Sequence, residues 1–192
     1  MNDRVDRNVH RLRIWHQQID RDAGRRARAL GPAWRCKRGC SACCRDGLRI
    51  FSVEALRICA DFGEQLASWK PHPPGKCAML DDAGACRIYS ARPYVCRTQG
   101  LPLSWIDSGP SGTVEWRDIC PINEPGLNLE TLPAEVLWQI GPAEGKLAVI
   151  ERCWDPSMER LGLRALFDPR LRKRLLTGAE MKEGDGEREA SQ

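Results

Sequence analysis

Nine residues, Cys36-Lys-Arg-Gly-Cys-Ser-Ala-Cys-Cys44, carry four of the ten cysteines of this chain. Cys40 and Cys43 stand in the C-x-x-C spacing that lets two thiolates grip one metal ion while backbone amides point at their sulfurs. Gly39 permits the tight backbone that such a turn needs. Cys43 and Cys44 are adjacent, and adjacent side chains diverge in most backbone conformations. This pair therefore indicates two metals, a polynuclear cluster, or one ligand beside one buried thiol.

Further cysteines downstream extend this set. The candidate metal ligands are Cys36, Cys40, Cys43, Cys44, Cys77, Cys86, Cys96 and Cys120. Imidazole ligands are scarce, because the chain has only three histidines, at positions 10, 16 and 72. A sulfur-only set suits zinc or an iron–sulfur cluster and argues against magnesium, calcium or a facial-triad iron site. We therefore expect zinc or an iron–sulfur cluster as the cofactor, and the spacing does not distinguish between them.

Charged residues flank the candidate ligands and allow two interpretations. They are Arg45, Asp46, Arg87, Arg92 and Arg97. Positive groups at these positions either bind an anionic ligand or stabilise an anionic thiolate site. Tyr89 and Arg97 are candidates for side chains that hold the ligands in position without binding the metal themselves.

The remaining two cysteines, Cys59 and Cys153, lie in apolar helical stretches. Free cysteine packs like a small hydrophobic residue. We predict that both are buried thiols outside the metal site.

The composition is that of an ordinary globular protein. The 192 residues are 42% hydrophobic and 29% charged, with a net charge of +4. This excess is too small for a protein that wraps nucleic acid or binds a membrane through a polybasic segment. The cysteine content lies below the roughly 8–10% of small disulfide scaffolds.

The N-terminal sequence MNDRVDRNVHRLRIW carries charges throughout and lacks the apolar core of a secretory signal. No stretch approaches the roughly 18 consecutive apolar residues of a transmembrane helix. We therefore expect a cytoplasmic protein, in which thiols stay reduced and cysteine clusters bind metals or act as catalytic thiols. A disulfide framework built from the even number of cysteines is the alternative.

The hydrophobic pattern predicts a mainly α fold with short β-hairpins, an irregular α+β single domain organised around the cysteine metal centre. We divide the chain into an N-terminal amphipathic helix (1–32), a cysteine-cluster metal-binding domain (33–125), C-terminal helices packed on it (126–177) and a disordered tail (178–192).

Apolar spacing and capping residues place the first elements. A helix over 3–30 is predicted from one apolar stripe, formed by Val5, Val9, Leu12, Trp15 or His16, and Ile19. Ser52 is expected to cap a helix from Val53 to about Ala67. Turn residues predict two hairpins, one joining 77–80 to 85–89 and one joining 103–106 to 113–116. Between the two hairpins, Ser90 is expected to cap a short helix that ends at Thr98.

Three or four short helices are predicted over 127–176. Asp155-Pro156 and Asp168-Pro169 each mark a helix start, with proline in the first position. Their core residues are expected to be Trp138, Ile140, Leu147, Val149 and Ile150.

A longer string of residues carries a family resemblance. Cys36-x-x-Gly-Cys-x-x-Cys-Cys44 is followed by Cys77-x-x-Leu80 and by Gly84-Ala-Cys-Arg-Ile-Tyr-Ser-Ala-Arg-Pro-x-x-Cys-Arg97. This pattern resembles the CxxCxxCC cysteine-cluster family, also called YkgJ-like, whose members are described as zinc- or iron-chelating domain proteins. The resemblance runs from residue 36 to about 100 or 120 and implies a metal centre of zinc or iron–sulfur type. The family pattern has two residues between its first cysteines whereas Cys36 and Cys40 have three between them, so Cys36 ranks behind the other ligands.

Three functional hypotheses follow. The first is a metal-binding protein with an accessory or partner-binding role, in which the centre holds the fold. The alternative is an iron–sulfur-dependent enzyme of methyl transfer or redox chemistry, by analogy with the flagellin lysine methylase, which carries a similar cysteine cluster. A nucleic-acid-binding module is disfavoured because the arginines of the first helix are mixed with acidic residues. No catalytic residues and no substrate-binding residues are identified, so whether the chain is an enzyme stays open, and no membrane partner is expected.

Overall fold

The computed structural model of this chain describes residues 2–37, 39–110 and 112–178. Its α-helices are α1 (Asp3–Ala29), α2 (Ser52–Ser68), α3 (Tyr94–Thr98), α4 (Ile140–Trp154) and α5 (Pro169–Thr177). Its strands are β1 (Arg49–Phe51), β2 (Leu103–Gly109), β3 (Gly112–Asp118), β4 (Trp138–Gln139) and β5 (Arg160–Gly162). Short 3₁₀ helices occupy Gly31–Ala33, Tyr89–Ala91, Leu129–Thr131 and Leu163–Phe167. The expected α+β fold, a single small domain with more helix than strand, is confirmed.

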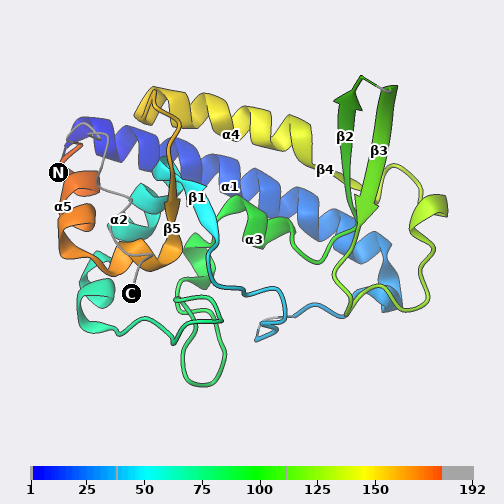
Figure 1. Cartoon of the computed structure of the whole chain (residues 1–192), viewed down its shortest axis with the longest axis horizontal. Helices are drawn as coiled ribbons and strands as arrows, with labels where there is room; N and C mark the ends of the chain where they lie inside the picture. The colour runs from blue at the N-terminus through cyan, green and yellow to red at the C-terminus, as the bar shows by residue number, and fades with distance from the viewer. Residues whose placement is uncertain (1, 38, 111, 179–192) are drawn as a thin grey trace.

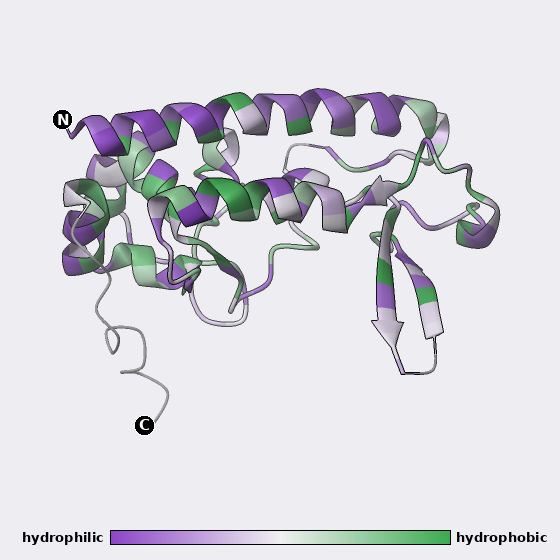
Figure 2. Ribbon diagram, turned by 90° about the horizontal axis from the view of Figure 1, so that it is seen from above, coloured by the Kyte–Doolittle hydropathy of each residue, from purple (hydrophilic) through white to green (hydrophobic). Residues whose placement is uncertain are grey.

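The long helix α1 forms one side of the molecule, with α2, α3 and α4 packed against it (Figure 1). The predicted apolar stripe is confirmed, and both Trp15 and His16 are buried within it. The rest of the α1 surface is mostly hydrophilic (Figure 2), with Ile14 as an exposed apolar residue. Amphipathic packing of this kind supplies most of the stability of a helix in a protein.

Helix α2 is the centre of the core, since its residues from Ser52 to Cys59 are all buried. The helix contacts α1, α4 and α5, and it is kinked at Phe62. Its N-terminal N–H groups are satisfied by two acidic side chains. Glu54 accepts from the N–H of Phe51 at 3.3 Å, and Glu151 of α4 accepts from the N–H of Val53 at 2.8 Å.

The strands form two small sheets. β1 pairs antiparallel with β5, and β3-β2-β4 form a second sheet in which β2 and β3 are antiparallel. The predicted hairpin over 103–106 and 113–116 is confirmed, and it projects from the helical body (Figure 1). The expected hairpin over 77–89 is reduced to a single bridge between Leu80 and Cys86.

Three of the expected helix caps, those at Ser52, Ser90 and Asp155, are wrong. Ser52 is the first residue of α2 rather than its cap, because its hydroxyl donates to Glu151 at 2.6 Å. Asp155 ends α4 instead of starting a helix, and its side chain accepts from the N–H of Ser157 at 3.0 Å. The Asp168 cap is confirmed, with the N–H of Arg170 donating to its side chain at 2.8 Å.

The short helix expected from Ser90 to Thr98 is divided. Tyr89–Ala91 forms a 3₁₀ helix and α3 begins at Tyr94, after Pro93, which occupies the N-cap position. Of the expected tail, Gly178 is the left-handed C-cap of α5, and 179–192 lie outside the described residues. Among the described helices, none has the length and apolar character needed to cross a membrane.

Replacing Leu12 of α1 tests the packing of this helix on the core. Leu12 is fully buried, so Leu12→Ala should lower the free energy of unfolding by about 2–5 kcal/mol. The matched control is Ile14→Ala, because Ile14 lies two residues away and is 45% exposed. That change should stay within about 0.5 kcal/mol. Equal losses for the two variants in urea unfolding would contradict the packing described here.

Candidate metal centre

Seven of the eight candidate ligands line one pocket. They are Cys36, Cys40, Cys43, Cys44, Cys77, Cys86 and Cys96. The pocket has a volume of about 660 Å³, and its walls also include Ala23, Gly24 and Ala27 of α1. None of the chain's three histidines, all of which lie in the described residues, lines it. Two carboxylates, Asp20 and Asp46, also line the pocket, and each forms an ion pair with an arginine. The thiols are therefore the main candidate donors, which fits zinc or an iron–sulfur cluster.

The thiols share a pocket without forming a closed coordination shell. Within residues 2–37, 39–110 and 112–178, no three His, Cys, Asp or Glu side chains are close enough together to hold one metal ion. All ten cysteines are free thiols. A metal would have to draw the sulfurs inward, as in sites that complete their folding only when the metal binds.

The first cysteine segment is built from tight turns. The N–H of Cys40 donates to the carbonyl of Lys37 at 3.0 Å, and the N–H of Cys44 donates to the carbonyl of Ser41 at 2.9 Å. Gly39 has φ 92°, a left-handed conformation that favours glycine. These turns bring Cys36, Cys40, Cys43 and Cys44 to one pocket, and residues 36–37 and 39–44 form no helix or strand.

The second segment docks directly on the first. The N–H of Cys77 donates to the carbonyl of Cys44 at 3.1 Å. The bridge between Leu80 and Cys86 then folds the chain back, with Asp81 accepting from the N–H of Ala85 at 2.7 Å at the turn. Cys77 and Cys86 therefore lie on the two arms of one loop.

Cys96 is carried by α3, and two buried side chains hold that helix. Glu54 accepts from the N–H of Tyr94 at 2.6 Å, at the first residue of α3. Arg97 forms an ion pair with Asp20 of α1 at 2.6 Å and donates to the carbonyls of Arg92 at 2.7 Å and Ser90 at 2.8 Å. Arg97 and Tyr89 both line the pocket, and a role for them in supporting metal ligands stays a prediction.

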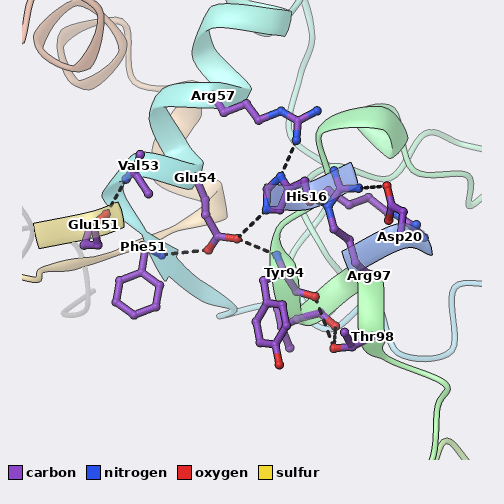
Figure 3. A network of polar contacts seen from close by, with 12 residues as sticks. His16, Asp20, Phe51, Val53, Glu54, Arg57, Tyr94, Arg97, Thr98 and Glu151 are labelled. Carbon is purple, nitrogen blue, oxygen red and sulfur yellow. Dashed lines mark hydrogen bonds and ion pairs between the residues drawn. The ribbon is translucent and has the colours of Figure 1, made fainter. Parts of the chain in front are cut away.

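A buried polar network lies behind this helix, between α1, α2 and α3 (Figure 3). Burial lowers the pKa of His16, and the positive charges of Arg97 and Arg57 lower it further. Its imidazole is therefore neutral. Because the guanidinium of Arg57 faces Nδ1, we assign the proton to Nε2, which lies 3.5 Å from the Glu54 carboxylate. Burial raises the pKa of Glu54 to about 7.

Asn123 connects three parts of the chain around Cys36 and Cys120. Its side-chain oxygen accepts from the N–H of Arg35 at 2.8 Å, and its amide group donates to the carbonyl of Gly100 at 2.8 Å. Its own N–H donates to the carbonyl of Cys120 at 2.8 Å. Cys120 is thereby held near Cys36, although it does not line the pocket.

The candidate thiols were predicted from the sequence, whereas the side chains that hold the cysteine segments in place were not. Glu54, His16 and Asn123 received no functional role, because their partners lie far away along the chain. One signal was available for Glu54, which stands three residues after Phe51, the spacing of a side chain that returns to cap its own helix.

The two remaining cysteines differ from each other. Cys59 is buried in α2, as predicted. Cys153 is exposed, so the prediction of a buried thiol is wrong there. Helix α4 turns Leu147, Ile150 and Trp154 inward, and this phase leaves Val149 and Cys153 on the opposite face. The expectation that Val149 belongs to the core is wrong for the same reason.

Residues 35–116 match the sequence profile of the CxxCxxCC family, described as a "putative zinc- or iron-chelating domain". We call residues 35–116 the CxxCxxCC domain after this match, which covers 82 of the 192 residues. The CxxCxxCC domain contains the seven cysteines that line the pocket, and Cys120 follows shortly after its end. No curated protein and no solved structure matches the chain.

Glu54→Gln tests the buried carboxylate through its pH dependence. The pKa of Glu54 is raised above its unfolded value of 4.5 to about 7, so the folded state holds the proton more tightly. Its contribution to stability is therefore present below pH 4.5 and lost as the pH rises through 7. Between pH 4 and pH 8, the free energy of unfolding of Glu54→Gln should shift in favour of the variant, relative to the unmodified protein, by on the order of 3 kcal/mol.

Urea unfolding at several pH values measures this difference. The matched control is Glu64→Gln, a substitution further along the same helix on a carboxylate that is not buried. A stability difference between Glu54→Gln and the unmodified protein that stays constant from pH 4 to pH 8 would show that Glu54 titrates normally.

Proposed function

We propose that the CxxCxxCC domain binds zinc or an iron–sulfur cluster through its cysteines, and that the protein has an accessory role in which the metal centre fixes a surface for a protein partner. The observation that carries the metal-binding proposal is the gathering of seven thiols, from three separate segments, on the walls of one pocket. The candidate ligands are those seven together with Cys120. A reducing compartment such as the cytoplasm would keep all of them available for metal.

Nearby arginines support an anionic thiolate site. Burial raises the pKa of Cys77 and of Cys86, and nearby guanidinium groups offset part of this rise, Arg164 and Arg87 at Cys77 and Arg92 and Arg87 at Cys86. The pKa of Cys43 is lowered to about 6, first by a hydrogen bond with the thiol of Cys44 and to a smaller extent by Arg92. Arg164 also forms an ion pair with Asp46 at 2.7 Å and donates to the carbonyl of His72 at 2.8 Å. The same side chain thus offsets negative charge and holds two cysteine segments together.

The energetics make the metal important for folding. A structural zinc contributes roughly 10–16 kcal/mol of binding free energy, whereas a whole domain is stable by roughly 5–15 kcal/mol. Residues 34–37 and 39–48 contain no helix or strand. Metal–thiolate bonds would crosslink a segment whose backbone is otherwise held by turn hydrogen bonds.

The β2–β3 hairpin supports the partner-binding part of the proposal. Trp105 and Trp116 are paired across the two strands and are 37% and 50% exposed. The register places Asp107 and Asp118 on the same face, one on each side of this pair. Such a face suits a protein segment that presents apolar side chains between basic residues.

The hairpin is connected to the cysteines at its base. Strand β2 begins soon after Cys96, and β3 ends two residues before Cys120. A metal held by these cysteines would fix the base of the hairpin and so the orientation of its tip.

The volume of the pocket favours an enzyme as the second candidate. A space of about 660 Å³ exceeds what one ion requires, and Arg45, Arg92 and Arg97 line it. An iron–sulfur-dependent methyl transfer or redox reaction would use the remaining space for a substrate. Calorimetry of the metal-loaded protein with S-adenosylmethionine tests the methyl-transfer version, and saturable binding would favour it over the accessory role.

Metal analysis of the protein as purified tests the metal-binding proposal directly. Anaerobic preparation without a tag and without chelator should yield bound zinc or iron, with visible absorbance when the metal is an iron–sulfur cluster. Removing the metal should lower the melting temperature, because the cysteine segments lose their crosslinks. A folded, colourless protein free of zinc and iron would overturn the proposal.

Hydrogen exchange tests the link between the metal and the hairpin. Loading the metal should slow amide exchange at 101–106 and 114–120, because both strand bases join cysteine segments. Helix α5 is the internal control, since it lies outside the CxxCxxCC domain and should change less. Unchanged exchange in the hairpin would separate it from the metal centre and remove the support for the partner surface.

A further inference from the structure

We propose that the acidic segment 179–192 of this chain docks on a basic groove formed by the first turns of α1 and the end of α4. The groove is lined by four basic residues of α1 and by one thiol of α4, namely Arg4, Arg7, His10, Arg11 and Cys153. None of the described acidic residues lines it. The inference is independent of the proposed metal binding, because these residues do not line the cysteine pocket.

Two guanidinium groups in this groove are free to bind an anionic group. Within the described part of the chain, the side chains of Arg7 and Arg11 form no hydrogen bond or ion pair, and both residues are exposed. They stand four residues apart, so they lie on the same face of α1 on successive turns. Arg4 has a different role, because it donates to the carbonyl of Trp154 at 2.6 Å and lies 5.0 Å from the centre of the Trp154 ring. Arg4 therefore holds the end of α4 against α1.

The sequence that follows Gly178 has the opposite charge. Five acidic residues and two basic residues occur in it: Glu180, Glu183, Asp185, Glu187, Glu189, Lys182 and Arg188. Residues 179–192 therefore have a net charge of −3, whereas the whole chain has a net charge of +4. Carboxylates pair strongly with guanidinium groups, so this segment is complementary in charge to the groove.

Gly178 lies beside one end of the groove. The side-chain amide of Asn2 donates to the carbonyl of Thr177 at 3.1 Å, which joins the end of α5 to the start of α1 (Figure 1). A Cβ atom placed on Gly178 would stand 3.7 Å from the ring of Trp154, the ring on which Arg4 lies. The acidic segment therefore begins next to Arg4.

The segment is long enough to follow the groove. From Arg4 to Arg11 a helix rises by about 10 Å, at about 1.5 Å per residue. The fourteen residues 179–192 can span up to about 46 Å when extended. A segment joined so close to its site meets it at an effective concentration of roughly millimolar, so individually weak ion pairs are sufficient for docking.

Photocrosslinking of the full-length chain tests this docking. The substitution Gly186→p-benzoylphenylalanine puts a photoreactive group among the acidic residues and leaves their charges unchanged. Irradiation should join residue 186 to peptides within 2–14 or 149–154 of the same chain, identified by mass spectrometry. Crosslinks to other surfaces only, or no crosslinks, would overturn the proposal. A crosslinked dimer in place of the intramolecular product would show that the segment docks on a second copy and would overturn the intramolecular contact.

Charge reversal identifies the residues that hold the segment. In Arg7→Glu/Arg11→Glu the crosslink yield should fall at least about threefold, because like charges then face each other. The matched control is Arg21→Glu/Arg28→Glu, which makes the same change of charge at exposed positions of α1 outside the groove and should keep the crosslink. Equal losses in the two variants would show a response to net charge alone and would contradict docking in the groove.

Salt tests the same contact with the groove unchanged, so this measurement does not depend on whether the charge-reversal variants fold. Raising the ionic strength to about 1 M shortens the Debye length to about 3 Å, and the crosslink yield should fall at least about threefold relative to about 0.05 M. A yield that is the same at both ionic strengths would show that charge does not hold the segment and would overturn the proposal.

Discussion

The carboxylate of Glu54 is buried at the start of α2 and accepts hydrogen bonds from the N–H of Phe51 and the N–H of Tyr94. Through these two bonds one side chain fixes where α2 begins and where α3 begins. Helix α3 carries Cys96, so the position of one thiol depends on a carboxylate in the core. His16 and Arg57 fill the space behind Glu54, and Arg97 fastens α3 to α1 (Figure 3). Polar partners offset part of the cost of burying Glu54, Arg57 and Arg97, and the raised pKa of Glu54 reflects the part that remains.

The molecule consists of a well-packed helical body and of cysteine segments with little regular secondary structure. Helices α1, α2 and α4 bury the core, and residues of α1 and α3 form part of the wall of the pocket. The segments that carry most of the thiols consist of turns, one bridge and left-handed glycines. A centre that binds metal needs ligands that can adjust, and a rigid wall limits how far they move. This arrangement is consistent with thiols that share a pocket before they form a coordination shell.

Features that depend on neighbouring residues could be predicted from the sequence, and features that depend on contacts between distant segments could not. The stripe of α1 and the thiol set were predictable because helical period and ligand chemistry are local properties. The cap of α2 was not, because Glu151, which binds Ser52 and Val53, comes from almost a hundred residues downstream. The exposure of Cys153 depended on which face of α4 packs against the core. Apolar residues lie on several sides of that helix, so their pattern does not identify the buried face. The role of Asn123 could not be predicted either, because its partners are backbone groups of distant segments.

X-ray absorption at the metal edge of the protein as purified tests the central claim that the cysteines alone hold the metal. The account predicts a first coordination shell of sulfur at about 2.3 Å, four atoms to each zinc, or cysteine and sulfide sulfur around iron. A shell that contains nitrogen or oxygen ligands from the protein would contradict it, because it would place a histidine or a carboxylate where the structure gathers thiols.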